Sequence, residues 1–282
     1  MSAYNASTTI KYSIESVIKQ SYGDWELVII DDKSIDDTIP VIKSFQDSRI
    51  KLITHDENLG AGLARRTGIK SASGDYIFFL DSDDYIAEDC LETLYFATKV
   101  TDADIINQGL HIVDESGKIL QSRVPDFCIE QGGSKFNHGT HDTKRYMHGM
   151  LFKKSLFDNV EYSSRRYIED TPTLVQLLYF ANKVFNLDYA GYYYVQNSSS
   201  LTHKAGMTKN FIYQALCVKD INDFFIQVNH PELVNTSHFL KLCSYINNSI
   251  SKNDEYLYKK ELDELQQYIN YINDDTTNTT IN

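Results

Sequence analysis

The sequence predicts an α/β fold in which helices flank a mixed, mainly parallel sheet and a smaller helical subdomain follows. Three observations support this prediction. The run Tyr76-Ile77-Phe78-Phe79-Leu80 is almost fully apolar, which is typical of strands covered on both faces, as in a parallel sheet. Strand-like runs alternate with helical segments at short intervals, and this order favours right-handed crossovers. Beyond residue 206, amphipathic helical spacing predominates.

Each element of the N-terminal half has a local signal. Ser7 or Thr8 can cap a helix whose apolar residues recur at helical spacing, and Gly23-Asp24 ends it. Gly74 separates the last helix of this half from the apolar run that follows. In chain order we expect this first helix, a strand at 25–30, a helix at 36–45, a strand at 50–54, a helix at 61–71 and a strand at 76–80.

The second half has a different pattern. Residues 105–113 and 118–124 flank the turn Asp114-Glu115-Ser116-Gly117, which predicts a hairpin. Residues 170–181 have helical spacing, and 183–194 read as a strand interrupted at Gly191. The chain should therefore consist of a main domain at 1–205, a helical C-terminal subdomain at 206–275 and a disordered tail at 276–282.

Composition excludes several functional classes. The formal net charge of -12 argues against a nucleic-acid partner and does not favour an anionic membrane surface. The four cysteines lie far apart without CxxC spacing, so we expect reduced thiols rather than a zinc site or a disulfide framework. Neither a stretch long enough to cross a bilayer nor a signal-peptide pattern is visible. We therefore expect a cytoplasmic protein.

Three carboxylates crowd the end of the apolar strand, in the segment Asp81-Ser82-Asp83-Asp84. Open α/β sheets place their ligands at the carboxyl ends of strands. Because like charges this close repel, a bound cation is a physical reason for keeping them together. Oxygen ligands favour a hard divalent ion such as Mg²⁺ or Mn²⁺. The alternative, an acidic start of the next helix, explains one aspartate more readily than three.

Three further residues of the N-terminal half suit a nucleotide. Asp32 follows the strand at 25–30, where a carboxylate can accept from a base N–H or a ribose hydroxyl. A turn or helix cap explains the pair Asp31-Asp32 equally well. Tyr4 offers a ring that can stack on a base, although most tyrosines simply pack. Arg65 can face phosphate, and a solvated helix surface is its alternative.

In their order along the chain, these segments resemble the family-2 glycosyltransferases with the GT-A (Rossmann-like) fold. The resemblance rests on Ser2-Ala3-Tyr4-Asn5, Val28–Asp32, Asn58–Gly68 and Asp75–Asp84, and it continues more loosely from Glu169-Asp170 to Ser200-Leu201-Thr202. It implies a nucleotide-sugar-binding half at 1–100 and an acceptor half at 101–205 within one GT-A domain.

The resemblance also implies roles for individual residues. The nucleotide-sugar donor would be bound by Ser2, Tyr4, Asp32, Arg65, Asp81, Ser82 and Asp83. Asp81 and Asp83 form the DxD motif, which would hold Mn²⁺ or Mg²⁺ with support from Asp84, and His203 would approach the metal or the phosphate. Asp170, with Glu169 beside it, matches the acidic pair that supplies the general base.

These roles imply an inverting transfer of a hexosyl or N-acetylhexosaminyl group, from a UDP-sugar to a glycan or lipid-linked saccharide. Such an enzyme would build a surface polysaccharide, a lipopolysaccharide or a glycoprotein glycan. It would act at the membrane periphery through its acceptor, and a homodimer would form through the C-terminal helices. The alternatives are a nucleotidyltransferase, a glycoside hydrolase, and a catalytically inactive module that binds nucleotides or sugars. The first usually has a Gly-rich N-terminal loop, and residues 1–20 contain no glycine.

The sequence departs from the family pattern at its start. Family members have an apolar strand before the Tyr-Asn segment, whereas Tyr4 here is close to Met1. We therefore expect either an in-frame apolar segment upstream in the gene or a fold that tolerates a weak strand edge beside 28–30. Arg66 also stands where the family often has Asn, and Val195 where it often has Arg. These two differences would alter donor or acceptor preference.

Overall fold

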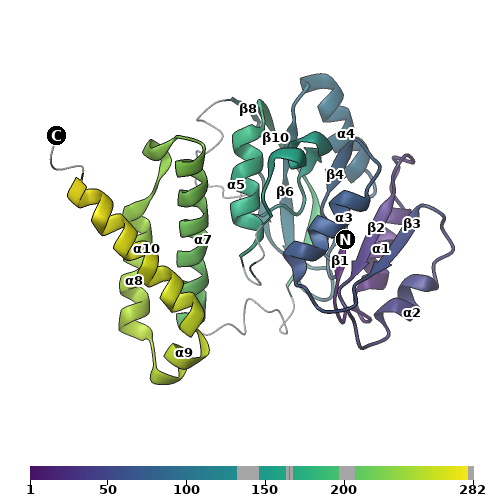
Figure 1. The fold of residues 1–282 in the computed structure, drawn as a ribbon. Helices are drawn as coiled ribbons and strands as arrows, with labels where there is room; N and C mark the ends of the chain where they lie inside the picture. Colours follow the sequence, from purple (N-terminus) through teal and green to yellow (C-terminus); the bar gives the residue numbers. More distant parts are fainter. Residues whose placement is uncertain (132–145, 163–164, 166–167, 197–206, 279–282) are drawn as a thin grey trace. The chain divides into compact units, whose positions relative to one another are not determined.

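The structure is a computed structural model that describes residues 1–131, 146–162, 165, 168–196 and 207–278. The chain divides into two compact units, Met1–Asn197 and Ser198–Asn282, shown in Figure 1. Each unit is described by itself.

The first unit begins with a parallel sheet of three strands in the order β1-β2-β3. These are β1 (Ser2–Ala3), β2 (Leu27–Asp31) and β3 (Ile50–Thr54). Every residue of β2 is buried, as its apolar sequence predicts. The helices α1 (Ile10–Ile18), α2 (Thr38–Lys43) and α3 (Ala61–Ser71) follow the strands in turn. α3 and β3 have the predicted bounds, and β2, α1 and α2 differ from theirs only near their ends, while β1 was not among the predicted strands.

A second, mixed sheet has the strand order β4-β9-β6-β10-β5, with β7 paired to β6 and β8 paired to β10. Its strands are β4 (Tyr76–Phe78), β5 (Tyr85–Ile86), β6 (Ile105–Val113), β7 (Ile119–Arg123), β8 (Cys128–Gln131), β9 (Leu151–Lys153) and β10 (Lys183–Val195). β6 and β10 run parallel, while the other pairs of this sheet are antiparallel. The helices α4 (Cys90–Thr101) and α5 (Asp170–Phe180) and the 3-10 helix η2 (Lys154–Asn159) complete the unit. The predicted α/β class is confirmed.

The hairpin between β6 and β7 is also as predicted. The carboxylate of Asp114 accepts hydrogen bonds from the backbone of Ser116 and Lys118, and Gly117 has a left-handed φ of 83°. Gly109 of β6 lies so close to β7 that a Cβ atom there would be 2.3 Å from the carbonyl oxygen of Arg123. Local turn chemistry and close strand packing therefore set the register together.

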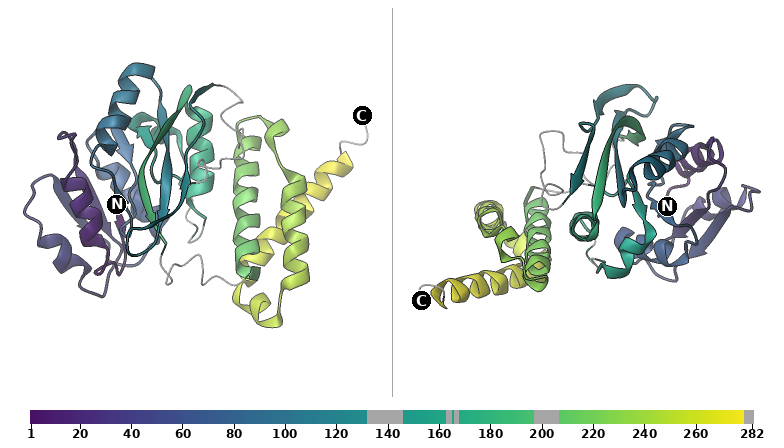
Figure 2. Two further views of the ribbon diagram at one scale, coloured as in Figure 1. Left: turned by 180° about the vertical axis from the view of Figure 1, so that it is seen from behind. Right: turned by 90° about the horizontal axis from the view of Figure 1, so that it is seen from above.

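No ladder of hydrogen bonds joins the two sheets among the strands that the structure describes. β1 is an edge of the first sheet and β4 is an edge of the second. The N-terminus lies between them, as Figures 1 and 2 show. The two sheets of the donor half are therefore separate beside β1 and β2, where the sequence analysis expected a weak strand edge.

The second unit is helical, as predicted. It contains α7 (Met207–Gln227), the 3-10 helix η3 (Pro231–Leu233), α8 (Thr236–Ser249), α9 (Lys252–Leu257) and α10 (Lys259–Asn278). Phe239 and Leu242 of α8 are buried against Ile212 of α7 and Leu265 of α10. α10 extends to Asn278, so it overlaps the expected tail at 276–282, and residues 279–282 lie outside the described chain.

None of the described helices combines the length and the apolar character needed to cross a membrane.

Candidate active site

The acidic segment after β4 forms a tight turn. The amide of Asp84 donates to the carbonyl oxygen of Asp81 at 3.2 Å, and the chain then enters β5. Asp81 and Ser82 are half-buried, while Asp83 is exposed. The three carboxylates are neighbours in sequence, but the turn places them in different surroundings.

Arg65 connects this turn to the acidic pair at the start of α5. One guanidinium nitrogen lies 3.2 Å from Asp81 Oδ1, and another lies 2.6 Å from Glu169 Oε1. Burial opposes the positive charge, but Asp81, Glu169 and Asp170 outweigh it and raise the pKa of the guanidinium. The three predicted site residues Arg65, Asp81 and Glu169 therefore meet in one ion-pair network.

Glu169 and Asp170 occupy the N-terminus of α5, with Glu169 as N-cap and Asp170 as the first helical residue. Ile168 before them has a φ of 54°, a left-handed value that is unusual for a β-branched residue and marks a constrained turn. Burial, together with the charges of Glu169 and Asp81, raises the pKa of the Asp170 carboxyl to about 6, although Arg65 acts in the opposite direction. A carboxylate with this pKa is suited to accepting a proton near neutral pH.

Asp83 and Asp84 have different environments. Partial desolvation by the surrounding protein, and then the charge of Asp81, raise the pKa of the Asp83 carboxyl to about 6, although the residue is exposed. Asp84 is only 1% exposed, and its two oxygens accept from the Tyr192 hydroxyl at 2.6 Å and the Val195 amide at 2.8 Å. Burial raises the pKa of Asp84 well above its usual value. The carboxylate of Asp84 thus holds β10, whereas that of Asp83 faces solvent.

His148 is a neighbour of Asp81 that the sequence reading did not identify. Its Nδ1 lies 3.8 Å from Asp81 Oδ2, and its ring stacks between Tyr146 at 4.9 Å and Tyr192 at 5.1 Å. Burial lowers the pKa of His148, although Asp81 opposes this change. Gly149 has a φ of 76°, and a Cβ there would lie 3.3 Å from the side chain of Tyr192. The glycine therefore lets the backbone pass close to the aromatic stack.

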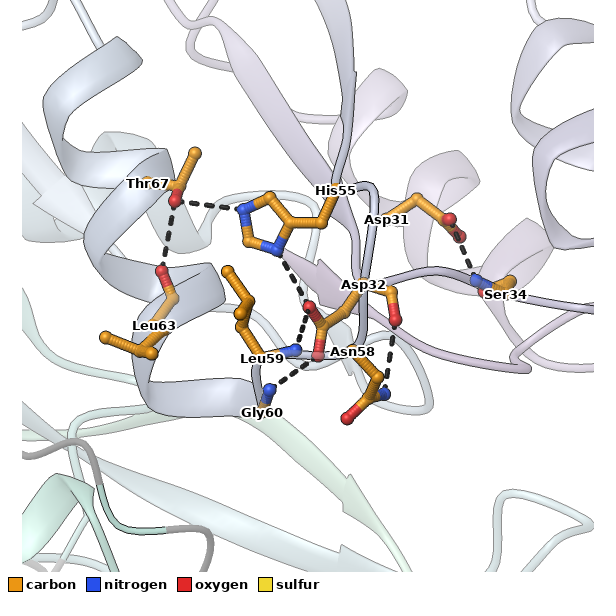
Figure 3. A network of polar contacts seen from close by, with 9 residues as sticks. All are labelled: Asp31, Asp32, Ser34, His55, Asn58, Leu59, Gly60, Leu63 and Thr67. Atoms are coloured by element: carbon orange, nitrogen blue, oxygen red, sulfur yellow. Dashed lines mark hydrogen bonds and ion pairs between the residues drawn. The ribbon is translucent and has the colours of Figure 1, made fainter.

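Asp32 contacts several protein groups at the end of β2. Its carboxylate accepts from the amides of Leu59 at 3.0 Å and Gly60 at 2.7 Å, and it lies 2.7 Å from His55 Nδ1. Figure 3 shows that Asp31 points the other way, toward Ser34. Asp32 thus fixes the turn that leads into α3, and base recognition by Asp32 stays a prediction.

The other predicted residues lie at the strand ends or outside the described chain. Ser2 belongs to β1, and the ring of Tyr4 beyond it is 51% exposed. Asn5 has a φ of 49° and accepts from the amide of Ile35 through its side chain, which anchors this turn to the loop after β2. The ring of Tyr4 is therefore accessible to a ligand. His203 lies outside the described residues.

The residues that the structure describes do not include a group of three or more His, Cys, Asp or Glu side chains arranged to hold a metal. The carboxylates of the turn after β4 still suit a hard cation in part. Asp83 is exposed, and partial desolvation by the surrounding protein and then the charge of Asp81 disfavour its charged form, so a divalent ion would offset both effects. Its remaining ligands would be water and phosphate oxygens, as is usual for Mg²⁺. Asp84 does not share this fit, because the Tyr192 hydroxyl and the Val195 amide occupy its carboxylate.

Comparison with known proteins identifies the family of this chain. The model of the family named Glycosyl transferase family 2 matches residues 1–159, which is more than half of the chain. The chain belongs to glycosyl transferase family 2. Glycosyltransferase GlyG of Streptococcus pneumoniae is 30% identical over 213 residues, covering 70% of each chain. An Escherichia coli relative, the UDP-Glc:alpha-D-GlcNAc-diphosphoundecaprenol beta-1,3-glucosyltransferase WfgD, is 54% identical over 84 residues, covering 30% of this chain and 33% of the relative.

Solved structures agree with the family in fold. A crystal structure of S. aureus TarS 1-349 in complex with UDP-GlcNAc matches with a TM-score of 0.66 and 19% identity. The match covers 95% of this chain and 77% of that one. A likeness at this identity shows the fold, so this family-2 glycosyltransferase has the predicted GT-A fold.

Proposed function

We propose that this family-2 glycosyltransferase transfers a sugar from a UDP-sugar to an acceptor hydroxyl with inversion, and that Asp170 is the general base. The observation that supports this most directly is the environment of Asp170. Its carboxyl has a pKa raised to about 6 and interacts electrostatically with Arg65 and Asp81. Glu169 forms the ion pair with Arg65, while Asp170 keeps a basicity suited to proton transfer.

The proposed reaction is a single displacement at the anomeric carbon. Asp170 takes the proton of the acceptor hydroxyl as its oxygen attacks, and the nucleoside diphosphate leaves from the opposite face. Arg65 holds Asp81 and Glu169 in place and so keeps the acidic pair beside the donor. Asp83, with Asp81, would hold a Mn²⁺ or Mg²⁺ ion, which neutralises the charge of the leaving diphosphate when bound. The exposed ring of Tyr4 would stack on the uracil base.

The donor and acceptor classes rest on similarity to other proteins. TarS was solved with UDP-GlcNAc and with UDP. The name of WfgD specifies a UDP-glucose donor and a lipid diphosphate-linked acceptor. We therefore propose hexosyl or N-acetylhexosaminyl transfer onto a lipid-linked saccharide during polysaccharide synthesis, at the cytoplasmic face of a membrane. A homodimer through the helical unit stays a prediction that sedimentation of the full chain can check.

Replacing the proposed base tests this function. Asp170→Asn keeps the shape of the side chain but removes its ability to accept a proton. We expect turnover to fall about a hundred- to ten-thousand-fold, with UDP affinity unchanged in calorimetry. Glu169→Gln is the matched control, and its loss of turnover should be smaller because the base remains. Near-normal turnover of Asp170→Asn would refute the assignment, and a greater loss in Glu169→Gln would move the base by one residue.

A further inference from the structure

Four aromatic rings stack together beside Asp81, at the end of β4. The His148 ring is nearly parallel to that of Tyr146, with centroids 4.9 Å apart and 10° between the planes, and to that of Tyr192, at 5.1 Å and 23°. The ring of Tyr194 is 6.0 Å from His148 and 15° from parallel. Tyr192 and Tyr194 are alternate residues of β10, so their side chains share one face of the sheet. We call these four rings the aromatic stack.

The backbone fixes the segment that carries two of the rings. His148 forms a parallel bridge with Phe79, and the Gly149 amide donates to the Phe79 carbonyl at 3.3 Å. Met147 and Met150, on either side of this bridge, are buried in the core that includes Phe79. The segment therefore runs beside the strand end that leads into the acidic turn, and it is anchored on both sides of His148.

Tyr146 is the exposed member of the aromatic stack. Tyr192 is fully buried and the side chain of His148 is 11% exposed, whereas Tyr146 is 40% exposed. Its ring thus has support from the protein on one side and access to solvent on another. A side chain that its neighbours already hold in place loses little conformational entropy when a ligand binds. The ring of Tyr146 is therefore a preformed contact surface.

The aromatic stack adjoins the ion-pair network of the candidate active site. His148 Nδ1 lies 3.8 Å from Asp81 Oδ2, and Asp81 Oδ1 lies 3.2 Å from the Arg65 guanidinium. Arg65 in turn contacts Glu169, the neighbour of Asp170. The rings therefore border the network that contains the proposed base.

The chemistry of this surface suits a sugar ring. The C–H groups on the face of a pyranose carry partial positive charge, and the face of an aromatic ring carries partial negative charge. The hydroxyls at the edge of the sugar need acceptors, which the carboxylates near the stack can supply. The residues proposed to contact the base, Tyr4 and Asp32, follow strands of the first sheet, whereas the stack is built on the second sheet. This separation favours a sugar of the acceptor over the nucleotide.

We propose that Tyr146 is the platform on which a pyranose ring of the acceptor saccharide stacks. The proposal rests on the proposed function, because it names the part of the acceptor that this site recognises. The sugar lies against the exposed ring of Tyr146, with its hydroxyls toward the acidic network. His148 and Tyr192 are positioning residues, since they hold the Tyr146 ring without contacting the sugar.

Separate KM values for donor and acceptor test the platform. Tyr146→Leu keeps an apolar side chain but removes the ring, so we expect the acceptor KM to rise about 3- to 10-fold while the donor KM stays unchanged. Tyr146→Phe keeps the ring and should restore most of the acceptor affinity. Tyr12→Leu makes the same change at a 67% exposed tyrosine of α1 and is the matched control. Tyr4→Leu should show the reverse pattern, with a higher donor KM and an unchanged acceptor KM.

Saturation-transfer NMR tests the same contact without turnover. The probes are short-chain alkyl diphosphates of N-acetylglucosamine, glucose and galactose, added to the full chain alone and with UDP and Mn²⁺. Irradiation of the aromatic protons of the protein should transfer magnetisation to C–H protons on one face of the sugar in at least one probe. This transfer should fall sharply in Tyr146→Leu and persist in Tyr12→Leu.

The two measurements distinguish failure of the platform from failure of the proposed reaction. An unchanged acceptor KM in Tyr146→Leu, or a rise in the donor KM instead, would overturn the platform. So would saturation transfer that is absent for every probe, or equal in Tyr146→Leu and the unmodified protein. Ring-dependent saturation transfer without turnover of any donor would refute the proposed reaction and leave the platform in place.

Discussion

Arg65 controls the charge balance of the candidate active site at the scale of single residues. It forms ion pairs with Asp81 and Glu169, and it lowers the pKa of Asp170 against the effects of burial. Arginine suits this position because its planar guanidinium donates to two carboxylates at once. The protonation of the proposed base therefore depends on a residue that does not itself transfer the proton.

This dependence predicts the pH profile of the enzyme. Because the folded pKa of Asp170 is about 6, kcat/KM should rise with pH through about that value and level off above it. In Arg65→Gln, the loss of the positive charge should move this rising limb to higher pH. Arg65→Lys, which keeps the charge but not the paired geometry, should leave the limb near its original pH. Identical limbs in Arg65→Gln and the unmodified enzyme would contradict this account.

Tyr192 gives a second prediction, on stability. Its hydroxyl donates to the buried carboxylate of Asp84 at 2.6 Å. Tyr192→Phe leaves that carboxylate with one donor fewer, which should lower the free energy of unfolding by about 1–3 kcal/mol. Tyr193→Phe is the matched control, because the ring of Tyr193 stacks on Tyr85 at 4.7 Å and that contact needs no hydroxyl. Urea unfolding of both variants checks this, and equal losses would show that the Asp84 hydrogen bond contributes little.

Sequence reasoning named several residues that meet at the candidate site but not their pairings. The strand end that carries Asp81 and Asp83 is visible as an apolar run followed by acids. The partners of Arg65 are not visible, because Glu169 is 104 residues away along the chain. His148 had no signal of its own, since its position depends on stacking with Tyr192 of β10. Contacts between distant elements determine these features, and local patterns do not encode them.

The turn before α3 shows how one side chain organises an element. Asp32 accepts from the amides of Leu59 and Gly60 and contacts His55, and His55 Nε2 lies 3.0 Å from Thr67 Oγ1 of α3 (Figure 3). These contacts attach the end of β2 to the N-terminus of the helix that carries the site arginine. The sequence indicated an acid at this strand end but left open whether its side chain faces a ligand or the turn.

Asp32→Asn should loosen this element. The amide side chain loses the negative charge that strengthens the hydrogen bonds from Leu59 and Gly60. We expect the free energy of unfolding to fall by about 1.5–3 kcal/mol and hydrogen exchange at residues 55–60 to accelerate. Asp56→Asn changes an exposed acid of the same segment and should have little effect on either quantity. If the two variants behave alike, Asp32 does not anchor the turn, and its predicted contact with the base becomes the stronger reading.

The elements that formed as predicted are those with local signals. The hairpin of β6 and β7 follows from its turn residues, and α3 has the predicted bounds. The separation of the two sheets has a different basis, although the sequence analysis expected a weak strand edge beside 28–30. It depends on how far β1 extends beside β2, and β1 contains only Ser2–Ala3. Strand pairing is a property of neighbours in space, so a pattern that identifies β2 and β4 does not show whether another strand joins them.

At the scale of the whole molecule, charge opposes the proposed donor. The chain has a formal net charge of -12, and a nucleoside diphosphate sugar is also anionic. Arg65 does not offset this repulsion alone, because Asp81 and Glu169 already engage its guanidinium. A divalent cation between the exposed Asp83 and the diphosphate would change the sign of the local field. Donor binding should therefore depend on the cation more than on direct contacts to basic side chains.

Calorimetry with UDP tests this dependence on a cation. We expect Mn²⁺ to strengthen UDP binding by about tenfold or more over binding in chelator, which corresponds to about 1.4 kcal/mol. Asp83→Asn removes the exposed charge without touching the buried Asp84 carboxylate, so its affinity with Mn²⁺ should fall to that of the unmodified protein in chelator. Asp170→Asn serves as the control, because the proposed base does not hold the cation and the variant should keep the full effect of Mn²⁺. Equal UDP affinity with and without Mn²⁺ in the unmodified protein would remove the cation from the donor site. A full effect of Mn²⁺ in Asp83→Asn would instead place the cation on other ligands.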